Sequence, residues 1–218
     1  KFHDAGYKVI AGCGPTRDYA KWLAEQKADG YTFTASVGNV SDWDSTKQAF
    51  EKVKSEHGNV DILVNNAGIT RDGVFRKMSL EDWRAVMDTN LNSMFNVTKQ
   101  VIDGMLDKGW GRIINISSVN GEKGQFGQTN YSAAKAGMHG FTMALAQEVA
   151  SKGVTVNTVS PGYIGTDMVR AIKPEVLQSI VASIPMGRLA KPEEIASLVA
   201  FLSSEDAGYI TGANISIN

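Results

Sequence analysis

The sequence holds a single cysteine, Cys13, among its 218 residues, and it has no run of 18 apolar residues. One cysteine excludes an internal disulfide and a cysteine-rich metal site, and without a long apolar run there is no candidate for a membrane-spanning helix. An excess of one charge is also lacking, because 22 Lys and Arg residues stand against 23 Asp and Glu residues. This balance argues against binding to nucleic acid or to an anionic membrane through bulk charge.

The first residues, 1–6, lack the apolar core of a signal peptide. Together with the lone cysteine, this favours a reducing, cytoplasmic location. The three histidines, His3, His57 and His139, are not spaced like metal ligands, so we expect no metal site. Proline is scarce, with five residues, whereas glycine is frequent, with 22. That combination suits an α/β protein with many tight turns.

Short apolar or β-branched segments alternate with helical ones along the chain. Strands are predicted at 8–12, 31–36, 61–65, 112–117, 154–160 and 214–217. Helices are predicted from a cap at Ser41 to His57, from a cap at Ser79, over 90–108 and 130–151, and from Pro174 and Pro192. This alternation indicates a Rossmann-like, doubly wound parallel sheet with helices on both faces, in a single domain over residues 1–218.

A fold of this kind opens with a strand, a glycine-rich loop and a helix whose N-terminus binds the cofactor pyrophosphate. The sequence instead opens near Gly6, a typical helix-ending glycine. We therefore expect the first βα unit to be missing and the C-terminus to stop within a strand pattern. A non-catalytic fragment of the fold is accordingly one alternative reading of the chain.

Three polar residues carry the strongest chemical signal. Tyr131 and Lys135 lie four residues apart in a predicted helix, so their side chains share one face. The Lys135 ammonium should favour the phenolate and lower the pKa of Tyr131 from its usual value of about 10. Ser118 ends a predicted strand at the edge of the sheet where open α/β sheets bind ligands. Taken alone, Tyr131 and Lys135 could equally be a surface pair without function.

Five motifs, in order, resemble those of the short-chain dehydrogenase/reductase family. They are Asn65-Asn66-Ala67-Gly68, Asp88-Thr89-Asn90-Leu91, Ser117-Ser118, Tyr131-Ser132-Ala133-Ala134-Lys135 and Pro161-Gly162-Tyr163-Ile164-Gly165-Thr166. The resemblance extends from about Gly6 to Gly212, nearly the whole chain. It implies an oxidoreductase that uses a nicotinamide cofactor and assembles as a homotetramer.

The resemblance also implies the role of each catalytic residue. Tyr131 would protonate the carbonyl oxygen of the substrate, and Ser118 would polarise that oxygen. Lys135 would hold the nicotinamide ribose and tune Tyr131, while Asn90 would anchor a water that links Lys135 to solvent. Hydrogen-bond donors already aimed at a developing oxyanion are an effective way to stabilise it.

By the same resemblance, the cofactor would contact Gly14, Arg17, Gly38, Asn39, Val40, Asn66, Ala67, Gly68, Tyr131, Lys135, Pro161, Gly162, Ile164 and Thr166. No acidic residue ends the strand at 8–12, where an NAD-binding protein carries a carboxylate for the ribose hydroxyls. Arg17 is within reach of the additional phosphate of NADP, which favours NADPH. The adjacent Asp18 argues against NADPH, because a carboxylate there suits NAD.

For the substrate, the chain resembles the branch of the family that reduces acetoacetyl-CoA in polyhydroxybutyrate synthesis. The matching residues, which would line an acyl-CoA site together with Ser118, are Asp72, Gln125, Phe126, Gln128 and Tyr163. Core packing is the alternative for the two aromatic residues. Cations for the CoA phosphates could come from Arg170, Lys173, Arg188 and Lys191, unless these are scattered surface charges.

Two other substrates stay open, because related enzymes share the catalytic residues. One is a 3-ketoacyl group on acyl carrier protein, as in fatty acid synthesis. The other is a steroid or sugar ketone. The acyl-CoA thioester is the substrate that the residues above favour.

Overall fold

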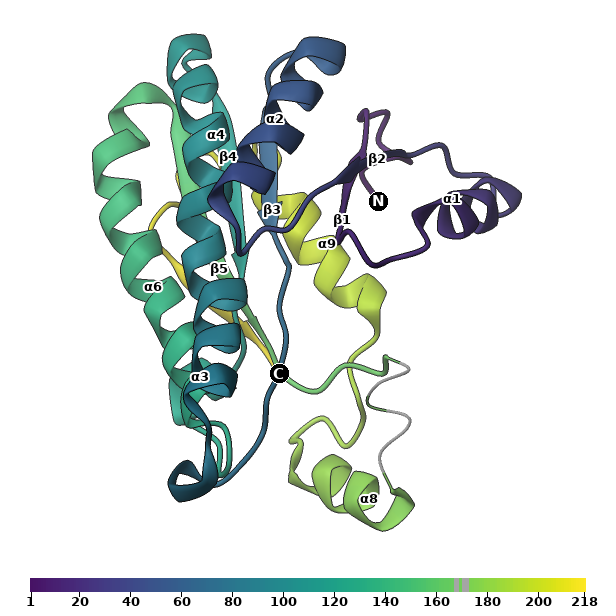
Figure 1. Cartoon of the computed structure of the whole chain (residues 1–218), viewed down its shortest axis with the longest axis vertical. Helices are drawn as coiled ribbons and strands as arrows, with labels where there is room; N and C mark the ends of the chain where they lie inside the picture. Colours follow the sequence, from purple (N-terminus) through teal and green to yellow (C-terminus); the bar gives the residue numbers. More distant parts are fainter. Residues whose placement is uncertain (167–168, 170–172) are drawn as a thin grey trace.

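The computed structural model describes residues 1–166, 169 and 173–218 and places its strands in two sheets (Figure 1). The smaller sheet pairs β1 (Ile10–Cys13) with β2 (Thr34–Val37). The larger has the order β3 (Ile62–Asn65), β4 (Gly111–Ile116), β5 (Val154–Pro161), β6 (Asn214–Ile217). Every pairing is parallel, as predicted, but the division into two sheets was not expected.

Helices lie on both faces of the larger sheet, which confirms the predicted doubly wound arrangement. The described helices are α1 (Tyr19–Ala28), α2 (Trp43–His57), α3 (Leu80–Met87), α4 (Ser93–Lys108), α5 (Asn120–Lys123), α6 (Thr129–Val149), α8 (Pro174–Ser183) and α9 (Pro192–Leu202). Single 3-10 turns occupy Phe75–Lys77 and Ala150–Lys152. Seen in Figure 1, α4 and α6 cover one face, while α9 lies on the other.

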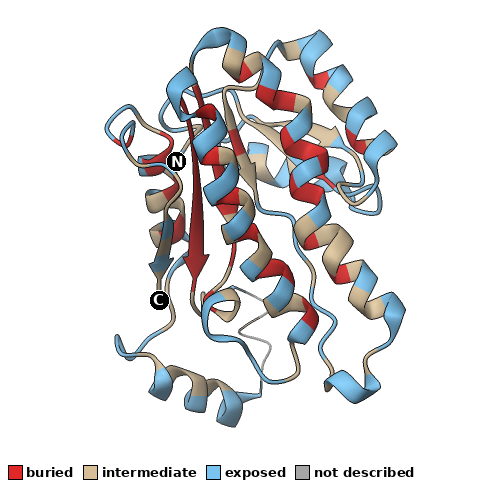
Figure 2. Ribbon diagram, turned by 90° about the vertical axis from the view of Figure 1, so that its left-hand side faces the viewer, coloured by how far each residue is buried: buried red, intermediate tan, exposed pale blue. Residues whose placement is uncertain are grey.

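Each face of the sheet has its own apolar core, because neighbouring residues of a strand point to opposite faces. Ile113 of β4 packs in the cluster that includes residues of α4 and α6. The next residue, Ile114, packs in the cluster that includes Ile195 and Val199 of α9. Figure 2 shows the buried residues concentrated on the strands and on the inner sides of these helices, whereas α8 has none.

The helix boundaries follow local chemistry, with one correction to the predicted caps. Ser79 caps α3 as expected, since its Oγ accepts from the backbone N–H of Asp82 at 3.0 Å. The cap of α2 is Asp42 rather than Ser41: Asp42 Oδ1 accepts from the N–H of Ser45 at 2.7 Å. The Ser41 hydroxyl is used elsewhere, donating to Asn39 Oδ1 at 2.8 Å.

Two further elements differ from the prediction. The helix expected from Asn90 begins as a π-helical turn, Asp88–Asn92, and continues as α4 from Ser93. The helix α1 was not predicted at all, because none of its residues is buried and its apolar positions therefore form no clear stripe. The predicted end of α4 at Gly109 is confirmed: this glycine adopts the left-handed conformation, with φ of +69°.

Candidate active site

The predicted catalytic residues meet at the carboxyl ends of β4 and β5. Ser118 follows β4, and Tyr131 lies in the first turn of α6. Both border a cavity of about 210 Å³, whose other lining residues include Thr70, Asn120, Gln128 and Tyr163. The cavity therefore lies at the sheet edge where α/β folds bind their ligands.

A buried asparagine that the sequence did not single out fixes the start of α6. Asn130 is fully buried, and its Oδ1 accepts from the N–H of Tyr131 at 2.8 Å. Its Nδ2 donates to the carbonyl of Arg71 at 3.0 Å. Asn130 therefore joins the helix that carries Tyr131 to the loop that follows β3. Its position directly before Tyr131 is the only signal that the sequence offered.

Lys135 lies one turn beyond Tyr131 and is only 3% exposed. Its Nζ donates to the carbonyl of Ile116 at 2.7 Å and lies 5.6 Å from the centroid of the Tyr131 ring. Burial disfavours the ammonium and lowers the pKa of Lys135 from its ordinary value to about 8. The side chain is therefore held close to the phenol and can lose its proton at mildly alkaline pH.

The pKa of Tyr131 moves in the direction opposite to the prediction. Burial raises it above the ordinary value, the negative charge of Asp72 raises it further, and a hydrogen bond from Ser118 acts in the lowering direction. The expected lowering by Lys135 is wrong for this structure. The ammonium lies over the phenol ring and gives a hydrogen bond to the main chain, and the cost of burial dominates.

Asn90 lies in the π-helical turn and is fully buried. Its Oδ1 accepts from the N–H of Ile69 at 2.8 Å, and its Nδ2 donates to the carbonyl of Ile69 at 2.9 Å. This pair of bonds fixes the segment after β3. π-helical turns frequently occur at functional sites, which agrees with the position of Asn90 here.

Two predicted cofactor residues are glycines with close neighbours: a Cβ on Gly68 would make ordinary van der Waals contacts, whereas one on Gly38 would be crowded. A Cβ on Gly68 would lie 3.4 Å from Asn90 Oδ1 and 3.6 Å from Lys135 Nζ. A Cβ on Gly38 would lie 3.0 Å from the Ala49 side chain. Gly68 therefore joins the catalytic group, while Gly38 permits close packing of α2 against the end of β2.

The other predicted cofactor residues fall into two groups. Gly162, Ile164 and Thr166 line the cavity beside Tyr131. The remaining ones follow strand ends or lie within the sheet: Gly14 and Arg17 after β1, Asn39 and Val40 after β2, Asn66 and Ala67 after β3, and Pro161 at the end of β5.

The side chains of three of these residues already make contacts within the protein. The Arg17 guanidinium lies 5.2 Å from the centroid of the Trp22 ring. Asn39 Oδ1 accepts from Ser41, and the Val40 side chain packs against the core between α4 and the sheet. The backbone of Asn39 is engaged as well, since its N–H donates to Ser45 Oγ at 2.9 Å and its carbonyl accepts from Thr46 Oγ1 at 3.1 Å.

The predicted substrate residues are only partly brought together. Gln128 and Tyr163 line the cavity, and Asp72 accepts from Gln128 Nε2 at 3.0 and 3.1 Å. Gln125 and Phe126 do not line it, and Phe126 is 86% exposed, which excludes the alternative of core packing for this ring. Asn120, which was not predicted, lies between Ser118 and Gln128 in the lining.

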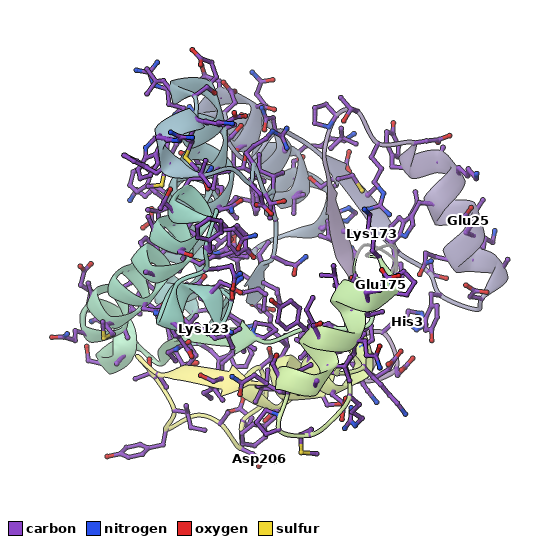
Figure 3. The ribbon with its side chains drawn as sticks, turned by 90° about the horizontal axis from the view of Figure 1, so that it is seen from below. His3, Glu25, Lys123, Lys173, Glu175 and Asp206 are labelled. Atoms are coloured by element: carbon purple, nitrogen blue, oxygen red, sulfur yellow. The ribbon has the colours of Figure 1, made fainter. Side chains whose placement is uncertain are left out.

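The four cations proposed for the CoA phosphates differ in availability. Arg170 lies outside the described residues. Arg188 forms a bidentate ion pair with Glu194, with both N–O distances 2.8 Å, and this pair lowers the pKa of Glu194 to about 2. Lys173 and Glu175 lie together at the start of α8 (Figure 3), and Lys191 precedes α9. Arg188 is therefore the least available.

Over the described part of the chain, no three His, Cys, Asp or Glu side chains lie close enough to hold a metal ion. The same residues include no helix with the length and apolar character needed to cross a membrane.

A parallel α/β sheet with this Ser, Tyr and Lys arrangement at its carboxyl edge defines an oxidoreductase site. A family profile described as short chain dehydrogenase matches residues 1–177. The chain belongs to the short-chain dehydrogenase family. Its similarity to reductases of this family implies a nicotinamide cofactor.

Curated relatives give the comparison at the level of single proteins. The chain is 72% identical over 214 residues to acetoacetyl-CoA reductase of Cupriavidus necator, covering 98% of this chain and 87% of that protein. It is 58% identical over 214 residues to nodulation protein G of Azospirillum brasilense, with the same two coverages, 98% and 87%. It is 52% identical over 180 residues to 3-oxoacyl-[acyl-carrier-protein] reductase of Vibrio cholerae, covering 83% and 74%.

Proposed function

We propose that this chain, as one domain over residues 1–218, reduces the 3-keto group of acetoacetyl-CoA to give (R)-3-hydroxybutyryl-CoA, with NADPH as reductant. The observation that carries the proposal is the group formed by the partly buried Ser118 and Tyr131 and the buried Lys135, beside the cavity. The 72% identity to an acetoacetyl-CoA reductase supports the choice of substrate. Such a product would suit polyhydroxybutyrate synthesis in the cytoplasm.

In this mechanism, residues of the chain stabilise the negative charge that develops on the carbonyl oxygen. Ser118 and Tyr131 donate hydrogen bonds to that oxygen, and Tyr131 transfers its proton to it. The raised pKa keeps the phenol protonated at neutral pH, so the acid is present in the required form. Lys135, with its lowered pKa, can then return a proton to the tyrosinate.

The residues beside this group fit a nicotinamide cofactor. Gly68 borders both Asn90 and Lys135, and its missing side chain leaves space there. When bound, NADPH supplies the hydride that adds to the carbonyl carbon. Gly14, Arg17, Gly38, Asn39, Val40, Asn66, Ala67, Gly68, Tyr131, Lys135, Pro161, Gly162, Ile164 and Thr166 would hold it.

The preference for NADPH over NADH rests on the turn after β1. That turn carries Arg17, whose side chain is exposed, and no carboxylate ends the strand. An arginine in this position suits the additional phosphate of NADP. The guanidinium would exchange its contact with Trp22 for the phosphate.

A 3-ketoacyl group on acyl carrier protein is the second candidate substrate, because the relative from Vibrio cholerae is named for it. The test measures NADPH oxidation with acetoacetyl-CoA, with an acetoacetyl-carrier-protein thioester and with a simple ketone. We expect kcat/KM to be at least about tenfold higher for acetoacetyl-CoA than for the carrier-protein thioester, since tenfold corresponds to only about 1.4 kcal/mol. A preference for the carrier protein would overturn the choice of substrate.

We also propose that the chain assembles as a homotetramer through α4 and α6. These helices expose apolar side chains, with Phe95 58% and Met143 51% exposed. Molar mass from light scattering tests this, and a monomer at micromolar concentration would contradict it.

A further inference from the structure

A chain of hydrogen bonds leads from an acidic loop to the catalytic serine. Asp72, in the loop after β3, accepts from Gln128 Nε2 at 3.0 and 3.1 Å. Gln128 Oε1 accepts from Asn120 Nδ2 at 3.0 Å. The backbone N–H of Asn120 in turn donates to Ser118 Oγ at 3.1 Å. The loop after β3 is thus joined, beside the cavity, to the segment between β4 and α6, which is distant from it in sequence.

The carboxylate of Asp72 sets the direction of the side-chain amide bonds in this chain, those of Gln128 and Asn120. An ionised carboxylate only accepts, so the amide of Gln128 must present its NH₂ group to Asp72. Its oxygen then faces Asn120, which must present its own NH₂ group. The bond to the carboxylate is charge-assisted and is therefore the strongest of the series. Arg71, the nearest cation in sequence, is directed to Asp82 at 3.9 Å.

The same order leaves one atom of Asn120 without a partner. Among the described residues, Asn120 Oδ1 is one of four buried side-chain polar atoms that make no hydrogen bond. An unsatisfied buried acceptor costs about 1–3 kcal/mol. The bonds that Asn120 makes to Gln128 and Ser118 must offset this cost.

For Ser118, the bond from Asn120 determines where the hydroxyl proton can go. The oxygen already accepts from the backbone of Asn120, so its own proton is available for another acceptor. That acceptor is the Tyr131 oxygen or, during reaction, the carbonyl oxygen of the substrate.

We infer that Asn120 is a positioning residue of this active site: held by Gln128 and Asp72, it aligns the Ser118 hydroxyl toward the reacting oxygen. The kinetic part of this inference rests on the proposed reductase activity. It also assigns an additional task to Gln128 and Asp72, which hold the serine loop in place.

The test compares Gln128→Glu with Gln147→Glu between pH 5.5 and 9. Gln147 lies in α6, which begins directly after Gln128; it is exposed and its side chain donates to the carbonyl of Met143, so it controls for the added charge. In Gln128→Glu, two carboxylates face each other. We expect kcat for acetoacetyl-CoA to fall about 10- to 100-fold at pH 8, the range for losing a charge-assisted hydrogen bond.

The pH profile separates positioning from simple packing. As the pH falls, the two carboxylates of Gln128→Glu share a proton, the bond to Asp72 re-forms, and kcat should recover. A residue that contacts the substrate would instead raise KM with little change in kcat. An increase in KM alone, or the same loss of kcat at every pH, would overturn the inference.

A second measurement needs neither substrate nor cofactor. The titration of Tyr131 is obtained from phenolate absorbance, as the difference between a protein and the same protein carrying Tyr131→Phe. Asn120→Ala keeps the backbone N–H that donates to Ser118 but loses the side-chain bond to Gln128 that holds this segment in place. The Ser118 hydroxyl should then be less well aligned, which should raise the pKa of Tyr131 by about half a pH unit or more. An unchanged titration would contradict the inference. If the wild type did not reduce acetoacetyl-CoA, the proposed function would fail, and this titration would still decide the role of Asn120.

Discussion

At the scale of single residues, the environment of each group decides its chemistry. Tyr131 is partly buried and Lys135 is buried, yet burial moves their pKa values in opposite directions, because it penalises the phenolate in one case and the ammonium in the other. The result is an acid that keeps its proton at neutral pH next to a base whose pKa is about 8. Pairs of titratable groups separated in this way are typical of acid–base catalysis.

Replacing Tyr131 by Phe should remove the proton donor and leave the fold intact. The ring is retained and only the hydroxyl is lost, so the thermal midpoint should change little. We expect kcat to fall by at least about 10²-fold, the usual contribution of one positioned acid. Steady-state kinetics together with circular dichroism test this. Near-normal turnover would show that another group protonates the carbonyl oxygen.

Lys135→Met should stabilise the protein while abolishing activity. A folded-state pKa of about 8, against an ordinary value of 10.5, means that keeping the ammonium buried at pH 7 costs roughly 3 kcal/mol. The folded lysine binds fewer protons than the unfolded one between these two values. The gain in the free energy of unfolding should therefore be complete below pH 8 and disappear as the pH rises toward 10.5. Urea denaturation at pH 7 and pH 10 measures it, and an equal gain at both would contradict this account.

At the scale of elements, the caps and turns determine where each functional residue lies. Asn130 joins α6 to the loop after β3, and the backbone N–H of Gly73 donates to the carbonyl of Gly127 at 2.8 Å. The loop before α6 and the loop after β3 therefore support each other on one side of the cavity.

The cap of α2 offers a direct test of its corrected assignment. Asp42→Ala should lower the free energy of unfolding by about 1 kcal/mol, because it removes the acceptor for the N–H of Ser45. Ser41→Ala is the matched control and should cost only a few tenths of that value. Chemical denaturation of both variants decides the matter; a larger loss in the serine variant would restore Ser41 as the cap.

Most elements could be predicted from the sequence because their ends carry local signals, such as Ser79, Gly109 and Pro192. The helix α1 could not, because it buries no residue and so has no apolar stripe. For the site, Ser118, Asn90 and Lys135 were found through motifs. Asn130 was missed because its importance lies in a hydrogen bond to Arg71, which is distant in sequence. Asn120 was missed because only the fold of the loop before α6 brings it to Gln128.

At the scale of the whole molecule, β1 and β2 form a sheet separate from the one that carries Ser118 and Lys135. A dinucleotide held by both Arg17 and Lys135 would have to contact both parts. Binding should therefore stabilise the molecule as a unit, by about 2.7 kcal/mol at a ligand concentration of 100 times Kd.

NADPH should accordingly raise the thermal midpoint more than NADH does at the same concentration. In Arg17→Ala, the difference between the two cofactors should disappear, because the cation for the additional phosphate is gone. Lys21→Ala, on the exposed side of α1, is the control and should retain it. Thermal scans with each cofactor make the comparison. If neither cofactor at millimolar concentration raised the midpoint, the non-catalytic alternative would be favoured.

The π-helical turn at Asp88–Asn92 has a consequence for sequence change. Such a turn holds one residue more than a regular helix with the same ends, and each helical residue rotates the chain by about 100°. Deleting one residue there would restore regular α-helical geometry and rotate the Asn90 amide away from Ile69. The two hydrogen bonds that fix the segment after β3 would then be lost. Single-residue deletions in this short stretch should therefore be selected against, even though α4 itself would be preserved.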